Sequence, residues 1–555
     1  MSGNMKLLLI NPSSMPSNEQ EALLNKSSIL RVPSFSMPIG LLDISAYLRQ
    51  NVPDVHIELL DIGKDLYQFY QKIQNAAPLS LKAFIDLELS TIDVAPDIVG
   101  ISILFSSAHK NSLLIADAVR QKWGNAIIVC GGNHATNYYR NLLSNKSIDY
   151  VIRGEGELSF AAFVKAVQDN IKDPNIQGLA GKGDIDGPSH LSPMVQVLDD
   201  IPMPALDLLD IGFYRSTVGG SLMFTRGCPF HCTFCASHTV HGRALRNKSN
   251  ERIMKEFHRL IQGLRFDKIV IEDDAFAVKK ENFLALASHL STLYSSIKFF
   301  LPQGLSVALM DEDVIDAMIS MGIDEASLAI ESGSPYVQKH IIKKNVSLSK
   351  ARTVLEYLRS KDFNIYINII LGFPGETRQL MQETINFMQT LDVDWVYIFH
   401  ALPLPGSELY QEFVARGTID PNDYDWDGVR LGRRNFDTPE ISAEGLENLV
   451  YDTNINVNFF NNSNLKHGRY QRAIDIFNRI IIDQYPFHIV GRYCRGDAYL
   501  RMGRQDAAVA DFEACRKWTL SNDESKRLYR RYHEKMPLLS PYISSVDIRD
   551  GKENQ

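Results

Sequence analysis

The sequence predicts a mixed α/β protein built in three parts. Apolar runs alternate with amphipathic stretches through residues 1–185 and again through 221–435, which indicates strands and helices in alternation around parallel sheets. A stretch rich in Gly, Pro, Asp and Ser, residues 186–220, is typical of a linker. Residues 436–555 show helical patterns without clear strands. We therefore expect two α/β domains, the linker between them and a helical C-terminal region.

Composition excludes several classes of protein. The 555 residues include 58 basic and 66 acidic side chains, a net charge of −8, with 45% hydrophobic and 22% charged residues. These are ordinary globular values, and the acidic total gives no support to a nucleic-acid partner. No apolar run approaches the length of a membrane-spanning helix, and six cysteines are too few for a secreted disulfide scaffold. We expect a cytoplasmic protein with no membrane and no nucleic-acid partner.

The first part predicts a doubly wound, Rossmann-like sheet. Its expected strands are residues 6–10, 55–61, 98–104, 126–130 and 148–152. Ligands of such sheets bind outside the carboxyl ends of the strands, where Asn11, Ser102, Gly131 and Gly154 fall. No Gly-x-Gly-x-x-Gly follows the first strand, which argues against a nicotinamide enzyme.

The second part predicts a partial (β/α)6 barrel. The expected strands are residues 222–225, 268–271, 298–301, 326–330, 365–371 and 395–399, with helices between them. In barrels of this kind the active site lies at the carboxyl ends of the strands.

The helical C-terminal region contains a weak internal repeat. Gly468-Arg469-Tyr470, followed by Ala473 and Phe477, recurs 35 residues later as Gly503-Arg504-Gln505, followed by Ala508 and Phe512. This spacing is close to the 34-residue period of tetratricopeptide (TPR) repeats. Two units are fewer than an independent solenoid needs, so we expect this region to pack on the barrel and to offer a surface to a protein partner.

Three cysteines are clustered directly after the first expected barrel strand. Cys228, Cys232 and Cys235 have the spacing Cys-x3-Cys-x2-Cys. Three thiolates on one short loop can bind three irons of a [4Fe–4S] cluster and leave the fourth iron open, as a catalytic metal site requires. The alternatives are a zinc site, with His231 or His238 as a fourth ligand, and three inert buried thiols.

This loop at the head of a βα barrel resembles the signature of the radical S-adenosylmethionine (SAM) enzymes, and the resemblance covers about residues 215–420. It implies that SAM chelates the open iron through its amino and carboxylate groups. It also implies that the reduced cluster cleaves SAM to a 5′-deoxyadenosyl radical, and that an external electron donor such as flavodoxin or ferredoxin supplies the electron.

Further strand ends resemble segments that contact SAM in this family. They are Glu272 and Asp273 after the second barrel strand and Glu331 and Gly333 after the fourth. After the fifth strand, Gly372 and Gly375 would let the backbone approach a ligand closely. The alternative for the second-strand acids is a helix N-terminal charge or cap, and for the fifth-strand segment the start of the next helix.

The first part resembles cobalamin-binding domains. Ser102 and Leu104 fit a Ser-x-Leu pattern at the end of the third strand, and Gly131-Gly132 follows the fourth. The loop after the first strand departs from the family, because Asn11-Pro12-Ser13-Ser14 replaces Asp-x-His-x-x-Gly and offers no histidine to cobalt.

Three more residues of this domain are candidates for cofactor binding: His134, Gly154 and Glu155. Ordinary loop and turn roles are the alternatives for them. The departure from the family pattern also leaves open that cobalamin binding has been lost.

The leading functional hypothesis is an enzyme that joins both cofactors, most simply for methyl transfer to a carbon of a small-molecule or peptide substrate. Cobalamin-linked cyclisation, rearrangement or oxidation is the alternative within the same class. A different hypothesis is a protein-docking module with a degenerate cobalamin domain, whose C-terminal repeats recruit a partner. An RNA methylthiotransferase is disfavoured by the acidic net charge and by the absence of a basic C-terminal β-domain.

Overall fold

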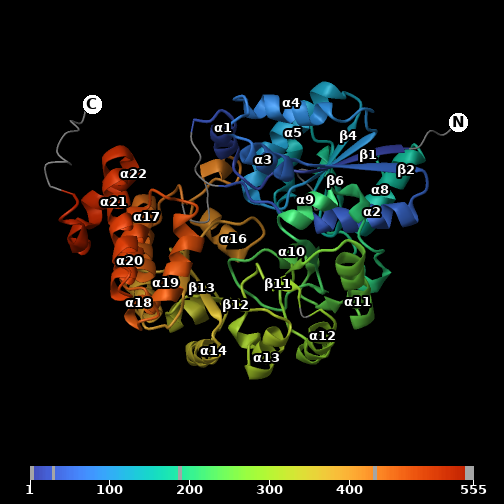
Figure 1. The fold of residues 1–555 in the computed structure, drawn as a ribbon. Coiled ribbons are helices and arrows are strands. Elements are labelled where there is room, and N and C mark those ends of the chain that lie inside the picture. Colours follow the sequence, from blue (N-terminus) through green and yellow to red (C-terminus); the bar gives the residue numbers. More distant parts are fainter. Residues whose placement is uncertain (1–4, 28–31, 185–189, 295, 429–433, 544–555) are drawn as a thin grey trace.

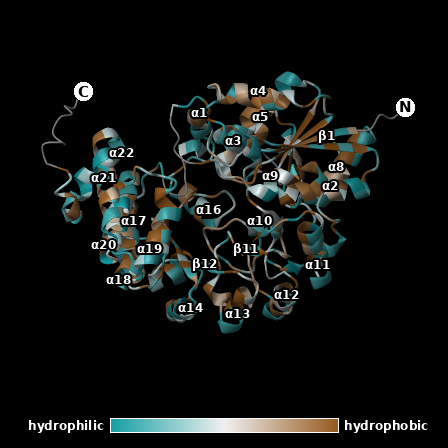
Figure 2. Cartoon of the chain, viewed as in Figure 1, coloured by the Kyte–Doolittle hydropathy of each residue, from teal (hydrophilic) through white to brown (hydrophobic). Residues whose placement is uncertain are grey.

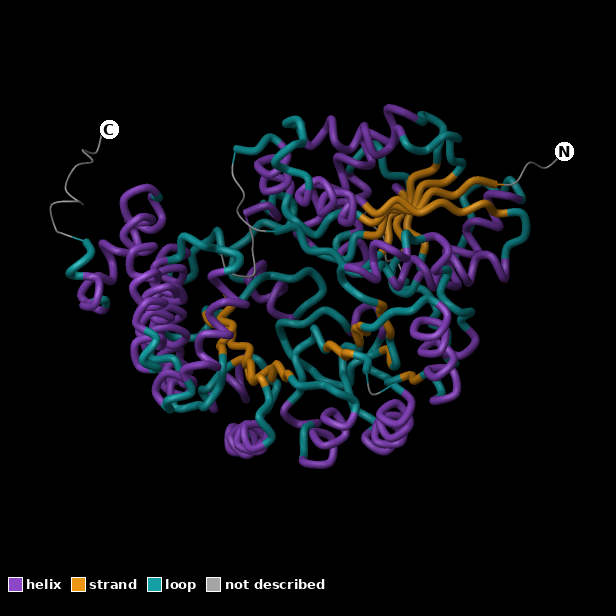
Figure 3. Tube along the Cα trace, in the orientation of Figure 1, coloured by secondary structure: helices purple, strands orange, loops and turns teal. Residues whose placement is uncertain are grey.

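The computed structural model describes residues 5–27, 32–184, 190–294, 296–428 and 434–543. Three regions follow one another along the chain, an N-terminal α/β region, a middle α/β region and a helical C-terminal region (Figure 1). Strands lie in the first two of these regions, and the described part of the third contains helices and loops without a strand (Figure 3). The mixed α/β class with parallel sheets is confirmed.

The N-terminal region contains a six-stranded sheet of order β2-β1-β3-β4-β5-β6. Its strands are β1 (Met5–Asn11), β2 (Val55–Asp61), β3 (Ile98–Ser102), β4 (Ile127–Gly131), β5 (Tyr150–Ile152) and β6 (Leu179–Gly181). The first five are parallel and β6 is antiparallel to β5. The strand order reverses between β1 and β3, and this is where doubly wound sheets bind ligands.

Helices cover both faces of this sheet. Side chains alternate along β1, so that Leu8 and Ile10 pack with α3 (Ile62–Gln71), α4 (Leu81–Ser90) and α5 (His109–Lys122). Leu7 and Leu9 pack on the other face, with α2 (Ile39–Asn51) and α8 (Gly156–Gln168). Because both faces are covered, β1 and β3 are nearly continuous apolar runs (Figure 2).

The segment between the two α/β regions has little regular structure. It contains the short helix α9 (Ile211–Ser216) and single helical turns. Residues 186–189, the start of the expected linker, lie outside the described residues.

The middle region holds two three-stranded parallel sheets, of order β7-β10-β11 and β12-β13-β14. The strands are β7 (Gly220–Leu222), β10 (Lys268–Ile271), β11 (Lys298–Phe300), β12 (Glu325–Glu331), β13 (Asn364–Leu371) and β14 (Trp395–His400). A parallel bridge between Leu305 and Leu328 links the chain after β11 to β12, with the Leu305 N–H 2.7 Å from the carbonyl oxygen of Ser327.

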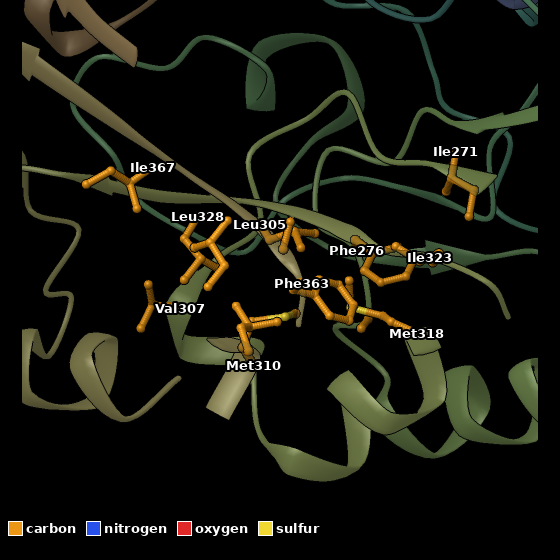
Figure 4. Packing of buried hydrophobic residues seen from close by; sticks show 14 of the residues in the cluster. Ile271, Phe276, Leu305, Val307, Met310, Met318, Ile323, Leu328, Phe363 and Ile367 are labelled. Atoms are coloured by element: carbon orange, nitrogen blue, oxygen red, sulfur yellow. The ribbon is translucent and has the colours of Figure 1, made fainter. Parts of the chain in front are cut away.

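Every second side chain of these strands packs under the outer helices. The covering helices are α11 (Asn250–His258), α12 (Lys280–Leu293), α13 (Glu312–Ser320), α14 (Leu348–Ser360) and α15 (Arg378–Gln389). Figure 4 shows part of this core, including Leu305, Leu328 and Ile367. The alternate side chains form an inner face that stays partly exposed, represented by Val270, Phe300, Ser327, Asn368 and Tyr397.

The C-terminal region packs against β13 and β14, because Tyr366 and Trp395 belong to its apolar core. Its longest helices are α17 (Ala443–Ile455), α20 (Ile489–Arg501) and α21 (Gln505–Ser521), joined by α19 (Tyr470–Phe477) and α22 (Asp523–Tyr532). At the outer edge of β14 the Asn458 side chain pairs with Val396 as a strand would. Its amide oxygen accepts from the Val396 N–H, and its amide nitrogen donates to the Val396 carbonyl, both at 2.8 Å.

The two repeat units have matching backbone geometry. Gly468 and Gly503 have φ of +72° and +73°, and Ala473 and Ala508 are both fully buried. Across the described residues, no helix is both long and apolar enough to cross a lipid bilayer.

One predicted strand is displaced. The strand expected at residues 222–225 is β7 (Gly220–Leu222), and the chain then turns into β8 (Thr225–Arg226), which pairs antiparallel with β9 (Arg246–Asn247). The cause is Asp273, whose buried carboxylate accepts hydrogen bonds from the Phe224 and Thr225 N–H groups at 2.6 and 3.1 Å and so draws the chain out of the sheet.

Candidate active site

The three clustered cysteines lie on one loop that β8 and β9 close at its base. Cys228, Cys232 and Cys235 are half-buried free thiols, whereas the other three cysteines of the chain are fully buried. Gly227 opens the loop with φ of +100°, and a Cβ there would lie 2.4 Å from the Ala244 carbonyl oxygen, so only glycine fits.

Hydrogen bonds fix this cysteine loop against two neighbouring segments. The Cys228 N–H donates to the Gly242 carbonyl at 3.2 Å. On the other side, Thr233 donates its N–H to the Ile342 carbonyl and its hydroxyl to the Ile341 carbonyl, at 3.1 and 3.0 Å. The loop is therefore held in place by hydrogen bonds that do not involve the thiols.

Burial raises the pKa of all three thiols, that of Cys232 to about 11, while the nearby Lys344 ammonium opposes the shift. Without a metal these thiols are therefore protonated at neutral pH, and metal binding would release the protons. Among the described residues, no three His, Cys, Asp or Glu side chains converge as the ligands of one ion do. In a [4Fe–4S] cluster each thiolate binds its own iron, so three thiolates on one loop would leave the fourth iron open.

The acidic residues after β10 divide into three roles. Both oxygens of Asp273 are occupied by the protein itself, because its second oxygen accepts from the Thr225 hydroxyl at 3.1 Å. The expected contact of Asp273 with a cofactor is therefore not supported. Glu272 lies half-buried on the inner face and accepts from the Ser221 hydroxyl at 3.2 Å. The exposed Asp274 accepts from the Ser237 hydroxyl at 2.5 Å, two residues beyond Cys235.

At the end of β12, Glu331 is placed near the cysteines and Gly333 is not. Glu331 has a φ of +68°, unusual for a side chain other than glycine, and its carboxylate accepts from the Lys344 ammonium at 2.8 Å. Gly333 allows close packing of α15, because a Cβ there would lie 2.4 Å from the Cβ of Phe387. Gly333 therefore has a packing role in the structure, and its contact with SAM stays a prediction.

The glycine loop after β13 is closed by hydrogen bonds to Glu376 of the same loop. Gly372 and Gly375 have φ of +87° and +79°. The buried Glu376 carboxylate accepts from the Gly372 and Phe373 N–H groups at 2.7 and 3.1 Å, and burial raises its pKa to about 8. The Arg434 guanidinium donates to the Gly372 carbonyl at 2.8 Å, so the end of the middle region also fixes this turn.

At the carboxyl edge of the N-terminal sheet, two large apolar side chains are exposed. Leu104 and Phe105, which follow β3, are 54% and 53% exposed. The half-buried Ser102 ends β3, and Asn11 ends the neighbouring β1 with its amide on the Asp61 carboxylate at 3.0 Å. Large apolar side chains exposed at a ligand-binding edge indicate a surface that another group covers.

The glycines of this edge differ in their geometry. Gly132 has φ of +98°, and a Cβ there would lie 2.7 Å from the Ile103 carbonyl oxygen, so the backbone needs glycine; Gly131 ends β4 in an ordinary conformation. Gly154, with φ of +93°, turns the chain after β5.

Two residues expected at this cofactor edge have other partners. His134 is buried, with one ring nitrogen 3.0 Å from His109 and the other 2.9 Å from the Ser106 hydroxyl, and burial lowers its pKa. The Glu155 carboxylate binds Arg246 in two hydrogen bonds and so contacts the base of the cysteine loop.

Sequence patterns missed several residues of this site. Four residues around the cysteine loop were not chosen as candidates: Lys344, Asp274, Arg226 and Arg246. Asp274 and Arg226 lie within segments that the sequence pattern singled out, whereas Lys344 and Arg246 belong to no local motif. A doubly wound sheet with an apolar open edge, followed by parallel strands that carry three cysteines on one loop, defines an enzyme that combines an iron–sulfur cluster with a large organic cofactor.

Comparison with known proteins agrees with this class. Residues 222–388 match the Radical SAM superfamily, and residues 28–164 match the B12 binding domain. The chain therefore contains a radical SAM domain and, before it, a B12-binding domain, and these two domains give a [4Fe–4S] cluster, SAM and cobalamin as its cofactors.

Relatives cover most of the chain. It is 29% identical over 490 residues to the cytidylyl-2-hydroxyethylphosphonate methyltransferase of Streptomyces wedmorensis, which covers 80% of this chain and 86% of that protein. The fold is similar to that of TsrM, a radical SAM methyltransferase from Kitasatospora setae solved with cobalamin and a [4Fe–4S] cluster. Its TM-score is 0.60 at 13% identity, covering 92% of this chain and 99% of TsrM.

A second solved structure shows the same fold. The cobalamin-dependent radical SAM enzyme OxsB, solved with aqua-cobalamin and SAM, gives a TM-score of 0.62 at 16% identity, covering 96% of this chain and 75% of OxsB.

Proposed function

We propose that this chain is a cobalamin-dependent radical SAM methyltransferase that transfers a methyl group to a carbon atom of a small molecule or peptide. The observation that carries the proposal is the joint presence of a cysteine loop at the ends of the middle strands and an exposed apolar edge on the N-terminal sheet. The relatives that cover three quarters or more of the chain are methyltransferases, and this supports methyl transfer over cyclisation, rearrangement or oxidation.

Cys228, Cys232 and Cys235 are the proposed cluster ligands. When bound, the reduced cluster and SAM supply a 5′-deoxyadenosyl radical, and methylcobalamin supplies the methyl group. Lys344, whose side chain is 9% exposed, holds a positive charge beside the loop and offsets part of the negative charge of the thiolates.

For SAM, we propose contacts from acidic side chains that face the cysteine loop. Asp274 and Glu272 fit the ammonium group of SAM, because both are acceptors on the loop side of β10 and neither has a cationic partner within salt-bridge distance among the described residues. Glu331 acts with its partner Lys344, and the ion pair would position the lysine for an anionic group. Gly372 and Gly375 would let the backbone after β13 lie close to SAM at the same strand ends, with their N–H groups donated to the Glu376 and Glu440 carboxylates at 2.7 and 2.8 Å.

For cobalamin, we propose the edge formed by Leu104 and Phe105, with Ser102 beside them and Gly131 and Gly132 across the sheet. The two apolar side chains would cover one face of the macrocycle and exclude water from it. The sequence after β1 offers no histidine, and His134 is already paired with His109 and Ser106. We therefore propose that no histidine of this edge binds cobalt.

The six parallel strands of the middle region are proposed to form the partial (β/α)6 barrel. The Leu305–Leu328 bridge joins the two sheets, and the outer helices cover one face of both. The substrate would bind against the inner face, where Ser327, Asn368 and Tyr397 offer hydrogen bonds and are left partly exposed.

We assign domains as residues 1–185 (cobalamin-binding), 186–220 (linker), 221–435 (barrel) and 436–555 (helical, with TPR-like repeats). The matching turns at Gly468 and Gly503 support the repeat assignment and a possible protein partner there. An electron donor such as flavodoxin would find exposed Lys339, His340 and Lys343 beside the cysteine loop, a basic surface suited to an acidic protein. The cytoplasmic location stays a prediction.

The first test is SAM cleavage. The chain is purified without oxygen, its cluster is rebuilt, and 5′-deoxyadenosine is measured by mass spectrometry after addition of SAM and a strong reductant. The protein with Cys228, Cys232 and Cys235 changed to Ala should hold no cluster and form no product. Cys494→Ala is the matched control, because that thiol is buried in the C-terminal region and should keep full activity. Product-free protein with four irons would contradict the proposal.

The second test separates methyl transfer from other radical chemistry. With SAM labelled as the CD3 form, mass spectrometry of the bound cobalamin should show a labelled methyl group. Unlabelled cobalamin, in a protein that cleaves SAM, would favour cyclisation, rearrangement or oxidation instead.

A further inference from the structure

The base of the cysteine loop carries two arginines that face each other. β8 and β9 pair antiparallel, so that Arg226 lies opposite Arg246. The cysteine loop, residues 227–245, connects these two arginines. Both side chains are nearly buried, at 5% and 8% exposure. Two buried like charges side by side destabilise a fold unless other charges compensate them.

The compensating carboxylates come from the cobalamin-binding domain. Arg226 donates to Asp43 on α2 at 2.9 Å and to Glu157 on α8 at 2.7 Å. Arg246 donates to both oxygens of Glu155, the residue just before α8, at 2.9 and 2.5 Å. All three carboxylates are 3% exposed. We name these five residues the clasp.

The clasp is strong for three physical reasons. The Arg246–Glu155 pair is bidentate, which fixes direction as well as distance. Glu155 is also 2.7 Å from the His241 ring, and the neighbouring cations hold the Glu155 pKa near 2 despite burial. Removal of one partner from such a network leaves a buried charge uncompensated, which costs far more than loss of an exposed ion pair.

A second contact restrains the same loop farther along. The Asn137 amide of the cobalamin-binding domain donates to the Thr239 hydroxyl at 2.7 Å, and Asn137 follows the Gly132 turn. The loop is thus held to the N-terminal sheet at its base and again beyond Cys235, and both anchors lie close to glycine turns at the carboxyl edge of that sheet.

We propose that the clasp is a positioning device, which sets the distance and orientation between the cluster loop and the cobalamin edge. In this role its residues act through the protein and not on either cofactor. The proposal rests on the proposed function, because it assigns the clasp to the coupling of the two cofactors. It also explains why Glu155, at a strand end suited to cofactor binding, is committed to protein contacts.

The first experiment needs no cofactor. Hydrogen exchange is measured on the apo full chain and on Glu155→Gln, which keeps the side-chain shape and removes the charge. Exchange in residues 227–245 and in α8 should become about tenfold faster or more, with the C-terminal helices unchanged. Asp511→Asn is the matched control, since Asp511 is also 2% exposed and pairs with Arg495 at 2.5 Å, remote from the loop. Equal protection in Glu155→Gln and wild type, or faster exchange throughout the chain, would overturn the proposal.

The second experiment measures the two cofactors together in the reconstituted full chain. When cob(II)alamin and the reduced cluster are both paramagnetic, the cluster speeds the spin relaxation of Co(II) in a way that depends steeply on their separation. Glu155→Gln should retain four irons and cobalamin but show weaker or more widely distributed relaxation enhancement than wild type and Asp511→Asn. Unchanged relaxation would overturn the proposal.

A milder variant keeps the test valid if Glu155→Gln fails to fold. Arg246→Lys keeps the charge and loses the bidentate geometry, so it should give a smaller change of the same kind in both measurements. Failure of wild type to take up cobalamin would contradict the proposed function alone, because the exchange experiment on the apo chain still tests the clasp.

Discussion

The two strand edges that meet in this enzyme are built from opposite kinds of side chain. The carboxyl edge of the N-terminal sheet presents exposed apolar residues, Leu104 and Phe105, and keeps its polar groups internally paired. The carboxyl ends of the middle strands present thiols, carboxylates and a lysine. The contrast fits a wide, weakly polar macrocycle on one side and a small, highly charged sulfonium ligand with its cluster on the other.

The largest expected effect is loss of cluster assembly at one edge without loss of cobalamin binding at the other. Cys232→Ser should abolish cluster assembly and 5′-deoxyadenosine formation, because a weakly acidic hydroxyl replaces a thiolate ligand. Cobalamin uptake, followed by absorbance, should remain within error of wild type. Simultaneous loss of iron and cobalamin would show that the edges are not independent.

A charge on the apolar edge should have the converse effect. Leu104→Asp should leave the free energy of unfolding nearly unchanged, because the side chain is half exposed, but should weaken cobalamin binding about tenfold. Equilibrium titration of apo-protein measures the affinity. Leu87→Asp is the matched control, since Leu87 is 53% exposed on α4, away from this edge, and should bind cobalamin like wild type.

A smaller, pH-dependent effect is expected at Glu376 on the polar edge. Its pKa of about 8 lies above the ordinary value of 4.5, so the folded chain binds this proton more tightly than the unfolded chain does. The stabilisation is fully present below about pH 4.5 and is lost as pH rises toward 8, by at most about 1.4 kcal/mol per pH unit. Glu376→Gln stays neutral, so its unfolding free energy should rise relative to wild type between pH 5 and 8.

Urea unfolding at several pH values measures this difference. Glu251→Gln is the control, because that side chain is 77% exposed and should track wild type at every pH. A pH-independent difference for Glu376→Gln would mean that the carboxyl is already ionised in the folded protein.

At His134 we expect no effect on cobalt coordination. His134→Gln should leave the absorbance of bound cobalamin and the nitrogen splitting of its Co(II) resonance unchanged, since His134 is buried among His109 and Ser106. A nitrogen splitting that disappears in this variant would identify His134 as a cobalt ligand.

Local sequence patterns predicted those parts of the site that are determined by residues adjacent in the sequence. The cysteine spacing, the strand ends and the glycine turns at Gly132 and Gly372 are of this kind, because loop chemistry and backbone conformation are local properties. The fold class followed for the same reason, from alternating apolar runs.

Partners distant in sequence could not be predicted. Asp273 fastens amides 49 and 48 residues upstream, and Arg226 binds carboxylates 69 and 183 residues away. Asp273 and Glu155 were therefore interpreted as cofactor contacts from their positions at strand ends. A buried carboxylate at such an end can serve the protein itself, and only its three-dimensional neighbours distinguish the two uses.

The side-chain amide of Asn458 has a consequence for how the chain avoids association. β14 is the last strand of its sheet, and an open edge strand is a template on which a second molecule can add a strand. Asn458, on a helical turn, already bonds the N–H and carbonyl groups of Val396. These groups are therefore not available to the backbone of a second molecule. The C-terminal helices thus protect this strand edge from intermolecular pairing. A chain shortened before them is expected to self-associate through β14.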